Sequence, residues 1–162
     1  GRKGEKIMSV IKIVNSKYEE PEDVQNLLNY VMSDKKNQER SKYVDAHLAF
    51  VGSNDDVYTQ MNYIKKIHNQ INGRQMYHVI VSAKEFAYCT EEEILEMGNI
   101  IAKKLFKDNQ TIYSVHNDTD YKHIHFAINN IKMASGNRLN LYQPEVQFQV
   151  NKIIDAYVNK SR

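Results

Sequence analysis

The chain has 162 residues, of which 41% are hydrophobic and 26% are charged, and its formal net charge is +2. These values fit one folded domain with a core and exclude a chain that is disordered throughout; no apolar run approaches the ~20 residues that span a bilayer. The net charge is too small to indicate a nucleic-acid binder by itself, but it leaves room for a local basic groove.

The sequence predicts one domain without linkers or repeats. Residues 1–7 precede the first methionine and are expected to be a remnant of expression or a flexible arm, so the domain is expected over residues 8–162. The single cysteine, Cys89, excludes an internal disulfide and a cysteine-based zinc site. A reducing cytoplasm is therefore the expected location.

Strands and helices alternate along the predicted domain. Pro21 opens a helix, Thr90 and Glu93 form the capping-box pattern, and Gly73 is expected to end a helix. The predicted strands are 7–14, 43–51, 75–82, 111–116 and 122–133, and the predicted helices are 21–33, 54–72, 90–107 and 143–160. Residues 34–42 are expected to form a solvated loop or a frayed helix end. This order, β-α-β-α-β-α-β-β-α, predicts an α+β fold with helices packed against a largely antiparallel sheet.

Three of the six histidines fall within ten residues: His116, His123 and His125. The last two predicted strands are joined by a few polar residues, so they are expected to pair as a hairpin with His116 opposite His123. His125 would then be the diagonal neighbour of His116. Three converging imidazoles are the ligand set of an open metal site, with positions left for substrate or water.

Other polar side chains are expected beside these histidines. Side chains alternate along a strand, so Asn129 shares a face with His123 and His125, whereas the opposite face is mainly apolar. Asp118 could hold a histidine N–H and raise the basicity of that ligand. His78 could border the same site from its own strand.

Tyr30 stands out among eleven tyrosines by its position on the predicted helix 21–33. Val24, Leu27, Leu28 and Val31 form the apolar stripe of that helix, and Tyr30 lies about 110° from the centre of the stripe. The pattern leaves open whether Tyr30 packs its ring at the edge of the core or reaches into a cleft.

The residues His116-x-Asp118-x4-His123-x-His125-x3-Asn129 resemble the signature of the MobP-type conjugative relaxases, or mobilisation nuclease domains. These belong to the HUH endonucleases, named for a triplet that here is His123-Ile124-His125. The context of Tyr30, the strand at 77–82 and the turn at 135–138 are also similar to this family. The resemblance extends over nearly the whole chain from Met8.

The resemblance implies a five-stranded, largely antiparallel sheet with helices packed on one face and the metal site on the other. It implies one divalent ion (Mn2+, Mg2+ or Zn2+) on His116, His123 and His125, Tyr30 as the nucleophile, and Asp118 as its base or as an orienting group. The expected substrate is single-stranded DNA at a transfer origin, nicked through a 5′-phosphotyrosyl intermediate and rejoined during plasmid or integrative-element mobilisation.

The resemblance also implies partners and a cellular setting. Accessory relaxosome proteins and a coupling protein are the expected partners, in the bacterial cytoplasm and without membrane insertion. Because relatives commonly continue beyond this domain, the chain is expected to be the N-terminal part of a longer protein.

A groove for DNA needs cations for the backbone and aromatic rings for the bases. Arg74 is among the cations expected to line the site. The other candidate cations are Lys12, Lys65, Lys66, Lys122, Lys132 and Arg138, and the candidate stacking rings are Tyr43, Tyr63, Tyr77 and Tyr121.

Three other functions fit parts of the pattern. A rolling-circle replication initiator of the HUH class would share the chemistry, but such initiators usually place their tyrosine after the histidines. A non-catalytic DNA-binding module with a structural metal would usually have four protein ligands. A phosphoesterase that uses water would leave no covalent adduct with DNA.

Overall fold

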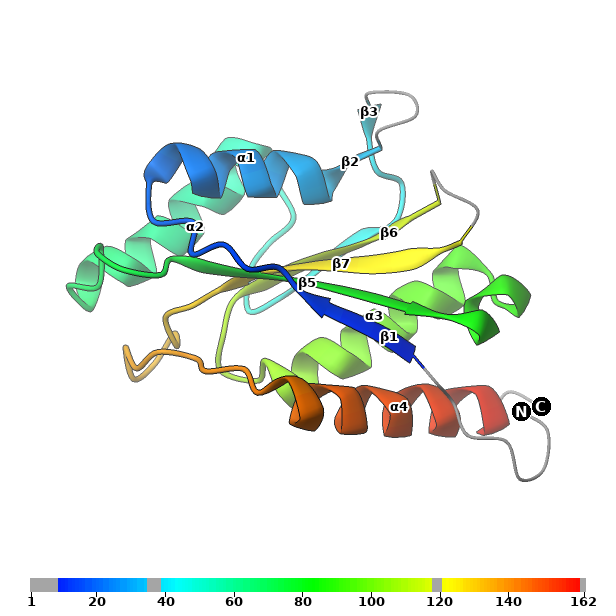
Figure 1. Ribbon diagram of the computed structural model, residues 1–162. Helices are drawn as coiled ribbons and strands as arrows, with labels where there is room; N and C mark the ends of the chain where they lie inside the picture. The colour runs from blue at the N-terminus through cyan, green and yellow to red at the C-terminus, as the bar shows by residue number, and fades with distance from the viewer. Residues whose placement is uncertain (1–8, 35–38, 118–120, 161–162) are drawn as a thin grey trace.

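A five-stranded antiparallel sheet forms the centre of the molecule (Figure 1), in a computed structural model that describes residues 9–34, 39–117 and 121–160. The strand order across the sheet is β1-β5-β7-β6-β4. The strands are β1 (Ser9–Ile13), β4 (Val44–His47), β5 (Met76–Ala83), β6 (Thr111–His116) and β7 (His123–Asn129). The expectation for residues 1–7 lies outside the described residues.

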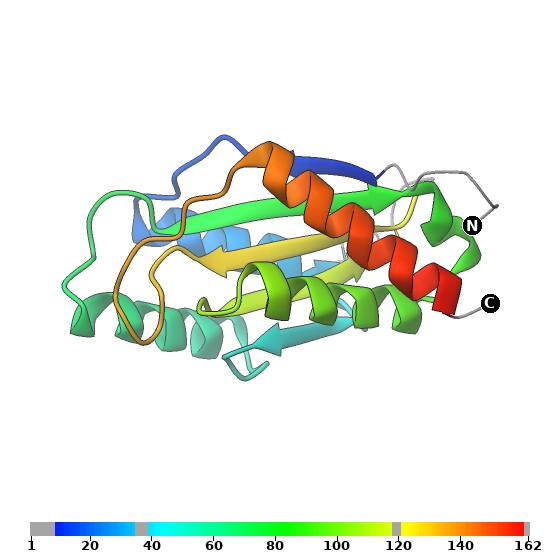
Figure 2. The same cartoon turned by 90° about the horizontal axis from the view of Figure 1, so that it is seen from below.

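Two helices cover each face of the sheet (Figures 1 and 2). The two pairs are α1 (Pro21–Met32) with α2 (Asn54–Ile67), and α3 (Glu91–Leu105) with α4 (Gln143–Lys160). The larger core cluster joins α3 and α4 to the sheet, and a second cluster joins α1 and α2 to the opposite face. The expected α+β fold with a five-stranded antiparallel sheet is thus confirmed, and the three histidines lie on the face away from α3 and α4.

The histidine face nevertheless carries helices of its own, which the expectation of helices on one face did not include. The apolar stripe of α1, with Val24, Leu28 and Val31, must be buried somewhere. It packs with α2 on Met76, Ile112 and Ala127, which point to the same side of the sheet as the histidines. Helix α1 therefore lies beside the histidines rather than behind them.

Local sequence signals explain where most helices begin. Thr90 accepts a hydrogen bond from the Glu93 amide and the Glu93 carboxylate accepts one from the Thr90 amide, which confirms the predicted capping box at the start of α3. Ser53 and Asp56 form a second capping box at α2. Pro21 occupies the first turn of α1, as predicted.

The structure differs from the predicted boundaries in several places. Helix α2 ends at Ile67 rather than near residue 72, because Asn69 adopts a left-handed conformation with φ of 55°. Gly73, at φ 77°, belongs to the following loop. The strand expected over 43–51 is short, since Leu48 has φ of 59°. In the expected loop, β2 (Ser33–Asp34) pairs with β3 (Glu39–Arg40), and a short 3₁₀ turn, η1 (Lys84–Tyr88), precedes α3.

The pairing of β6 with β7 follows the prediction. His116 is the partner of His123 and Ser114 is the partner of His125, so the three imidazoles project from one face at the same end of two central strands. β5 pairs with β7 on the other side and places His78 opposite Ala127 and Ile80 opposite His125. Among the described residues, no helix has the length and hydropathy needed to cross a membrane.

Candidate metal centre

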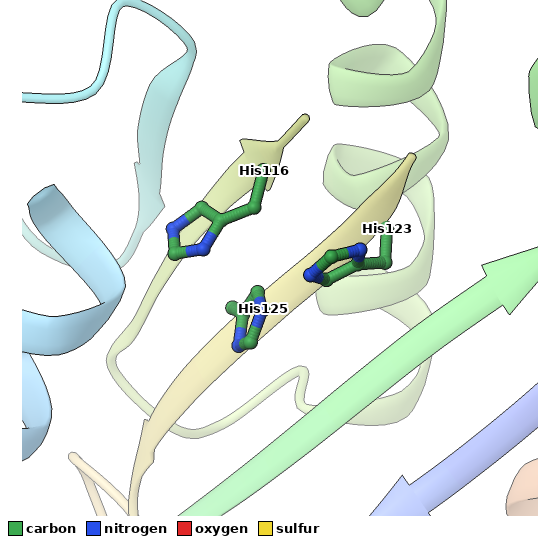
Figure 3. Close-up of side chains that lie close together, drawn as sticks. All are labelled: His116, His123 and His125. Atoms are coloured by element: carbon green, nitrogen blue, oxygen red, sulfur yellow. The ribbon is translucent and has the colours of Figure 1, made fainter. Parts of the chain in front are cut away.

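His116, His123 and His125 converge above β6 and β7 (Figure 3). One ring nitrogen from each histidine lies within 4.8 Å of the others, and these three could hold a metal ion. The ring centroids of His116 and His125 are 4.2 Å apart, and those of His123 and His125 are 4.8 Å apart. His116 and His125 are buried while His123 is half-exposed, so the site is anchored in the sheet and open on one side.

The orientation of His116 is set by the end of helix α1. Its Nε2 donates a hydrogen bond to the carbonyl oxygen of Val31 at 2.9 Å, because a carbonyl can only accept. This oxygen is one of the last carbonyls of α1, which have no partner within the helix, and Ser114 also donates to it. Nδ1 of His116 is left as the metal-ligand atom, and the negative end of the α1 dipole favours a cation here.

The other two histidines are oriented in the same way. Nδ1 of His123 donates to the carbonyl oxygen of Tyr121 at 2.9 Å, which leaves Nε2 of His123 as the ligand atom. Nδ1 of His125 lies 2.9 Å from Nε2 of His78, so the ligand atom of His125 is its own Nε2. Each imidazole thus has one nitrogen held by the protein and one for an ion, the arrangement typical of metal-binding histidines. The residues present fit a divalent metal.

His78 is a neutral partner of this site. Burial, together with the nearby His116 and Lys12, lowers the pKa of His78 to about 4. A neutral His78 can accept the Nδ1–H of His125 with its Nε2, and its Nδ1 then faces the hydroxyl of Tyr18 at 3.5 Å. The sequence placed His78 at the border of the site, and the structure places it in direct contact with His125, one of the candidate metal ligands.

Tyr30 lies over the histidines. Its ring centroid is 5.4 Å from that of His125, 5.7 Å from that of His78 and 6.1 Å from that of His116. The side chain is 36% exposed, so solvent or a substrate can reach it. Tyr30 immediately precedes Val31, so the same turn of α1 both presents the phenol and fixes His116. The sequence left open whether Tyr30 packs at the edge of the core or reaches into a cleft, and the structure favours the cleft.

Two residues expected to line the site have structural contacts elsewhere. The Asn129 side chain is fully buried and donates to the Met61 carbonyl and to Gln110. Arg74 donates to the carbonyls of Ser16 and Met76, and its guanidinium lies 4.2 Å from the centroid of the Tyr77 ring. Asp118, the expected base or orienting group, lies outside the described residues.

The residues expected to contact DNA fall into a buried group and an exposed group. Lys65 is 2% exposed and Tyr77 is 8% exposed, so the structure excludes both from a DNA surface. Lys122 pairs with Glu91 at 3.5 Å beside the histidine hairpin. Lys12, by contrast, is exposed on β1 and shares a cavity wall with Tyr30 and His78.

Sequence reasoning missed two parts of the site. The Val31 carbonyl carries no side-chain signal, and its position depends on how α1 packs on β6. The contact between His78 and His125 depends on the pairing of β5 with β7, which joins residues 47 apart in the chain. Only the position of His78 on its own predicted strand indicated that it could lie near the site.

Comparisons with known proteins agree on one family. The family model described as "Relaxase: MobA/VirD2-like, nuclease domain" matches residues 30–161. Protein TraI of Escherichia coli is 31% identical over 110 residues, which cover 67% of this chain and 15% of TraI. Protein rlx of Staphylococcus aureus is 34% identical over 90 residues, which cover 54% of this chain and 28% of rlx. The matches therefore span less than a third of the length of these relatives.

A solved structure shares the fold. It is described as the molecular basis of vancomycin resistance transfer in Staphylococcus aureus, and it superposes with a TM-score of 0.60 at 12% identity. The match covers 97% of this chain and 94% of the other. At this level of identity the likeness concerns the arrangement of helices and strands alone.

Proposed function

The chain belongs to the MobA/VirD2-like relaxases, because it matches the model of their nuclease domain. We therefore propose that it nicks and rejoins single-stranded DNA at a transfer origin. The reaction is a metal-dependent transesterification with Tyr30 as the nucleophile. The observation that carries this proposal is the position of the Tyr30 ring, 5.4 Å from the His125 ring in a cluster of three histidines that could hold a metal. A nucleophile and an electrophilic site thus meet in one opening.

His116, His123 and His125 would hold the divalent ion through Nδ1, Nε2 and Nε2, respectively. When bound, that ion supplies Lewis-acid chemistry, because it draws charge from the oxygens of the scissile phosphate. His78 keeps His125 in the tautomer that presents Nε2, and the Val31 carbonyl does the same for the Nδ1 of His116. The protein thereby fixes the ligands before DNA arrives.

Tyr30 attacks the phosphorus with its phenol oxygen. The new bond joins that oxygen to phosphorus, and the bond between phosphorus and the 3′-oxygen breaks. The 3′-oxygen takes up a proton, and the phenol proton passes to an acceptor, for which Asp118 is the candidate from the sequence. The products are a 5′-phosphotyrosyl link and a free 3′-hydroxyl. Because the phosphoester is retained, attack by a 3′-hydroxyl reverses the reaction and rejoins the strand.

The proposal extends to the setting of the reaction. The substrate is one strand of a plasmid or integrative element, exposed at its transfer origin, and accessory relaxosome proteins and a coupling protein are the partners. The family model supports this setting, since it matches residues 30–161, which contain Tyr30 and the three histidines.

The test is covalent capture of DNA. Fluorescent single-stranded oligonucleotides that tile the mobile element encoding the chain are incubated with the protein and Mn2+. We expect one of them to give a band on a denaturing gel that shifts with the protein and disappears on protease treatment. Tyr30→Phe should abolish this adduct and leave binding of the same oligonucleotide within about twofold, because the ring is retained.

Tyr63→Phe is the matched control, since Tyr63 is 62% exposed on α2 and should form the adduct normally. An undiminished adduct in Tyr30→Phe would show that another residue is the nucleophile. Cleavage without any adduct, in the wild-type chain, would instead identify a phosphoesterase that uses water.

A further inference from the structure

A cavity of about 430 Å³ adjoins Tyr30 and His78 on the side away from the histidine hairpin. Its lining comes from β1 and β5, from α1 between Asp23 and Tyr30, and from the segment between β1 and α1. Its volume is near the small end of the range for ligand pockets, which suits one nucleotide rather than a folded partner. A DNA strand attacked by Tyr30 would therefore place a neighbouring nucleotide at this opening.

The lining of the cavity has an apolar part and a polar part. Val14, Leu27 and Ile80 offer apolar surface for the flat face of a ring, and Tyr18 also lines the cavity. Lys12 is exposed on the β1 wall, where its ammonium group can meet a backbone phosphate. This combination matches a nucleotide better than a sugar phosphate alone, which has no apolar face to bury.

The α1 wall carries the hydrogen-bonding groups. Asp23 and Asn26 both line the cavity, and both are exposed. A carboxylate only accepts hydrogen bonds and repels phosphate, so Asp23 favours a base that donates through an amino group. Adenine, cytosine and guanine carry an exocyclic amino group. Thymine carries none, and its one donor, N3–H, lies between two carbonyl oxygens that repel a carboxylate. Asn26 can donate and accept, so it can complete the pairing with any of the three.

We propose that this cavity binds the base of the nucleotide next to the scissile phosphate and selects a base with an exocyclic amino group through Asp23 and Asn26. The inference rests on the proposed function, because it assumes that Tyr30 and the histidines hold the phosphate at the mouth of the cavity. It adds a sequence-reading site on α1, in the half of the helix that precedes the nucleophile.

The first experiment uses mononucleotides and does not depend on cleavage. Backbone-amide NMR spectra of the full chain are recorded with millimolar dAMP, dCMP, dGMP, dTMP and 2-deoxyribose 5-phosphate. We expect the amino-bearing nucleotides to shift amides around 12–18 and 23–30, with roughly tenfold or greater weakening for dTMP, since a hydrogen bond to a charged group is lost. Equal binding of dTMP or of the sugar phosphate, or no shifts, would overturn the proposal.

A change of one side-chain group then tests the selectivity. Asp23→Asn keeps a side-chain oxygen for the Glu20 amide, to which Asp23 now bonds at 3.2 Å, so the helix start is preserved. The new amide NH₂ can donate to thymine, and we expect the discrimination against dTMP to fall to within about twofold. Asp55→Asn, in the first turn of α2, is the matched control and should retain full discrimination. Unchanged discrimination in Asp23→Asn would remove Asp23 from the site.

The second experiment places the cavity on the DNA. The oligonucleotide that forms the Tyr30 adduct is made abasic at each position in turn, and its affinity for Tyr30→Phe is measured. Loss of the cavity's base should weaken binding roughly 5- to 150-fold at one position flanking the nick, as for a stacked base. If the adduct forms but no abasic position weakens binding, the base-binding role of the cavity is refuted and the nicking function is retained. Selective mononucleotide binding without any adduct would refute the nicking function and leave the cavity standing.

Discussion

The contact between His78 and His125 joins a neutral histidine to a candidate metal ligand. His78 accepts the Nδ1–H of His125 at 2.9 Å, and burial lowers the pKa of His78 to about 4, so His78 carries no charge at pH 7. Partners of this kind typically contribute 10- to 100-fold to metal affinity, as an order-of-magnitude guide. His78→Ala should therefore weaken Mn2+ binding by about 10- to 100-fold in a calorimetric titration.

Two variants separate this effect from a loss of folding. His78→Gln keeps an oxygen that can accept the same hydrogen bond, so it should recover part of the affinity. His47→Ala removes a histidine that bonds the Lys107 carbonyl at the other end of β4, and it should bind Mn2+ normally. If His78→Ala lowered only the thermal stability of the metal-free protein, His78 would be a packing residue and not a positioning residue.

Lys65 makes the stability of the protein depend on pH. Burial, and secondarily the charge of Arg138, lowers the pKa of Lys65 to about 7, and Nζ lies 3.6 Å from the sulfur of Met76. In the unfolded chain the pKa of lysine is about 10.4, so between pH 7 and pH 10 the unfolded state binds more protons. The free energy of unfolding should rise with pH in this window by up to about 1.4 kcal/mol per pH unit. Below pH 7 Lys65 is protonated in both states, so it adds no pH dependence there.

Urea unfolding at pH 7, 8 and 9 measures this slope. Lys65→Met replaces the ammonium group by an apolar side chain of similar length, so we expect a more stable protein at pH 7 and a smaller rise towards pH 9. The exposed neighbour Lys66, changed to Met, should keep the wild-type slope. A wild-type slope in Lys65→Met would mean that Lys65 is charged in the folded protein at pH 7.

The burial of Lys65 could be inferred from its helical spacing, although not from its residue type. Val57, Met61 and Ile64 form the apolar stripe of α2, and Lys65 follows Met61 by four residues on the same face. The convergence of His116, His123 and His125 was predictable because a short hairpin fixes its own register. The position of Tyr30 over these histidines was not predictable from the helix pattern, since the angle of a side chain on a helix does not say what faces that flank.

At the scale of elements, the capping box of α3 stabilises a helix far from the histidines. Thr90 accepts from the Glu93 amide at 3.1 Å, and loss of such a cap typically costs about 0.5–2 kcal/mol. Thr90→Ala should lower the free energy of unfolding by about that amount. Because α3 packs on the opposite face of the sheet, the Mn2+ affinity should not change.

Thr59→Ala provides the comparison for this helix cap. Thr59 is exposed within α2, and its replacement by a better helix former should leave stability the same or slightly higher. Equal losses in the two variants would show that the hydroxyl of Thr90 contributes no more than a surface hydroxyl.

Helix starts were predictable and helix ends were less so. Pro21, Ser53 and Thr90 act through hydrogen bonds or fixed dihedrals within four residues, so their sequence context suffices. The end of α2 depends on Asn69, which takes a conformation more often assigned to glycine, and the prediction chose Gly73 instead. The small β2–β3 hairpin lies in a polar stretch without alternation, which gives no periodic signal.

For the whole molecule, the order of the strands was the part least accessible from local patterns. The short hairpin predicted that β6 pairs with β7. Alternation shows only which side of a strand is buried, so it could not identify the neighbours of β5 or the second neighbour of β6. The resemblance to relaxases supplied the five-stranded antiparallel sheet, and the structure supplied the order β1-β5-β7-β6-β4. That order sets His78 beside His125 and brings α1 over β6 and β7, and it therefore completes the site.

Because the three histidines lie on two central strands and His116 is tied to α1, metal binding should stabilise the fold as a whole. An ion that binds only the folded state adds about 2.7 kcal/mol at a concentration 100 times Kd. For a chain of this size that corresponds to a rise in Tm of roughly 5–10 °C, measurable by calorimetry with Mn2+ and with EDTA. His123→Ala with His125→Ala should abolish the rise, whereas His47→Ala should retain it. The double variant keeps only one of the three imidazoles, which is too few ligands to hold the ion. If Mn2+ still raised the Tm of this variant, the stabilising ion would bind outside the histidine cluster.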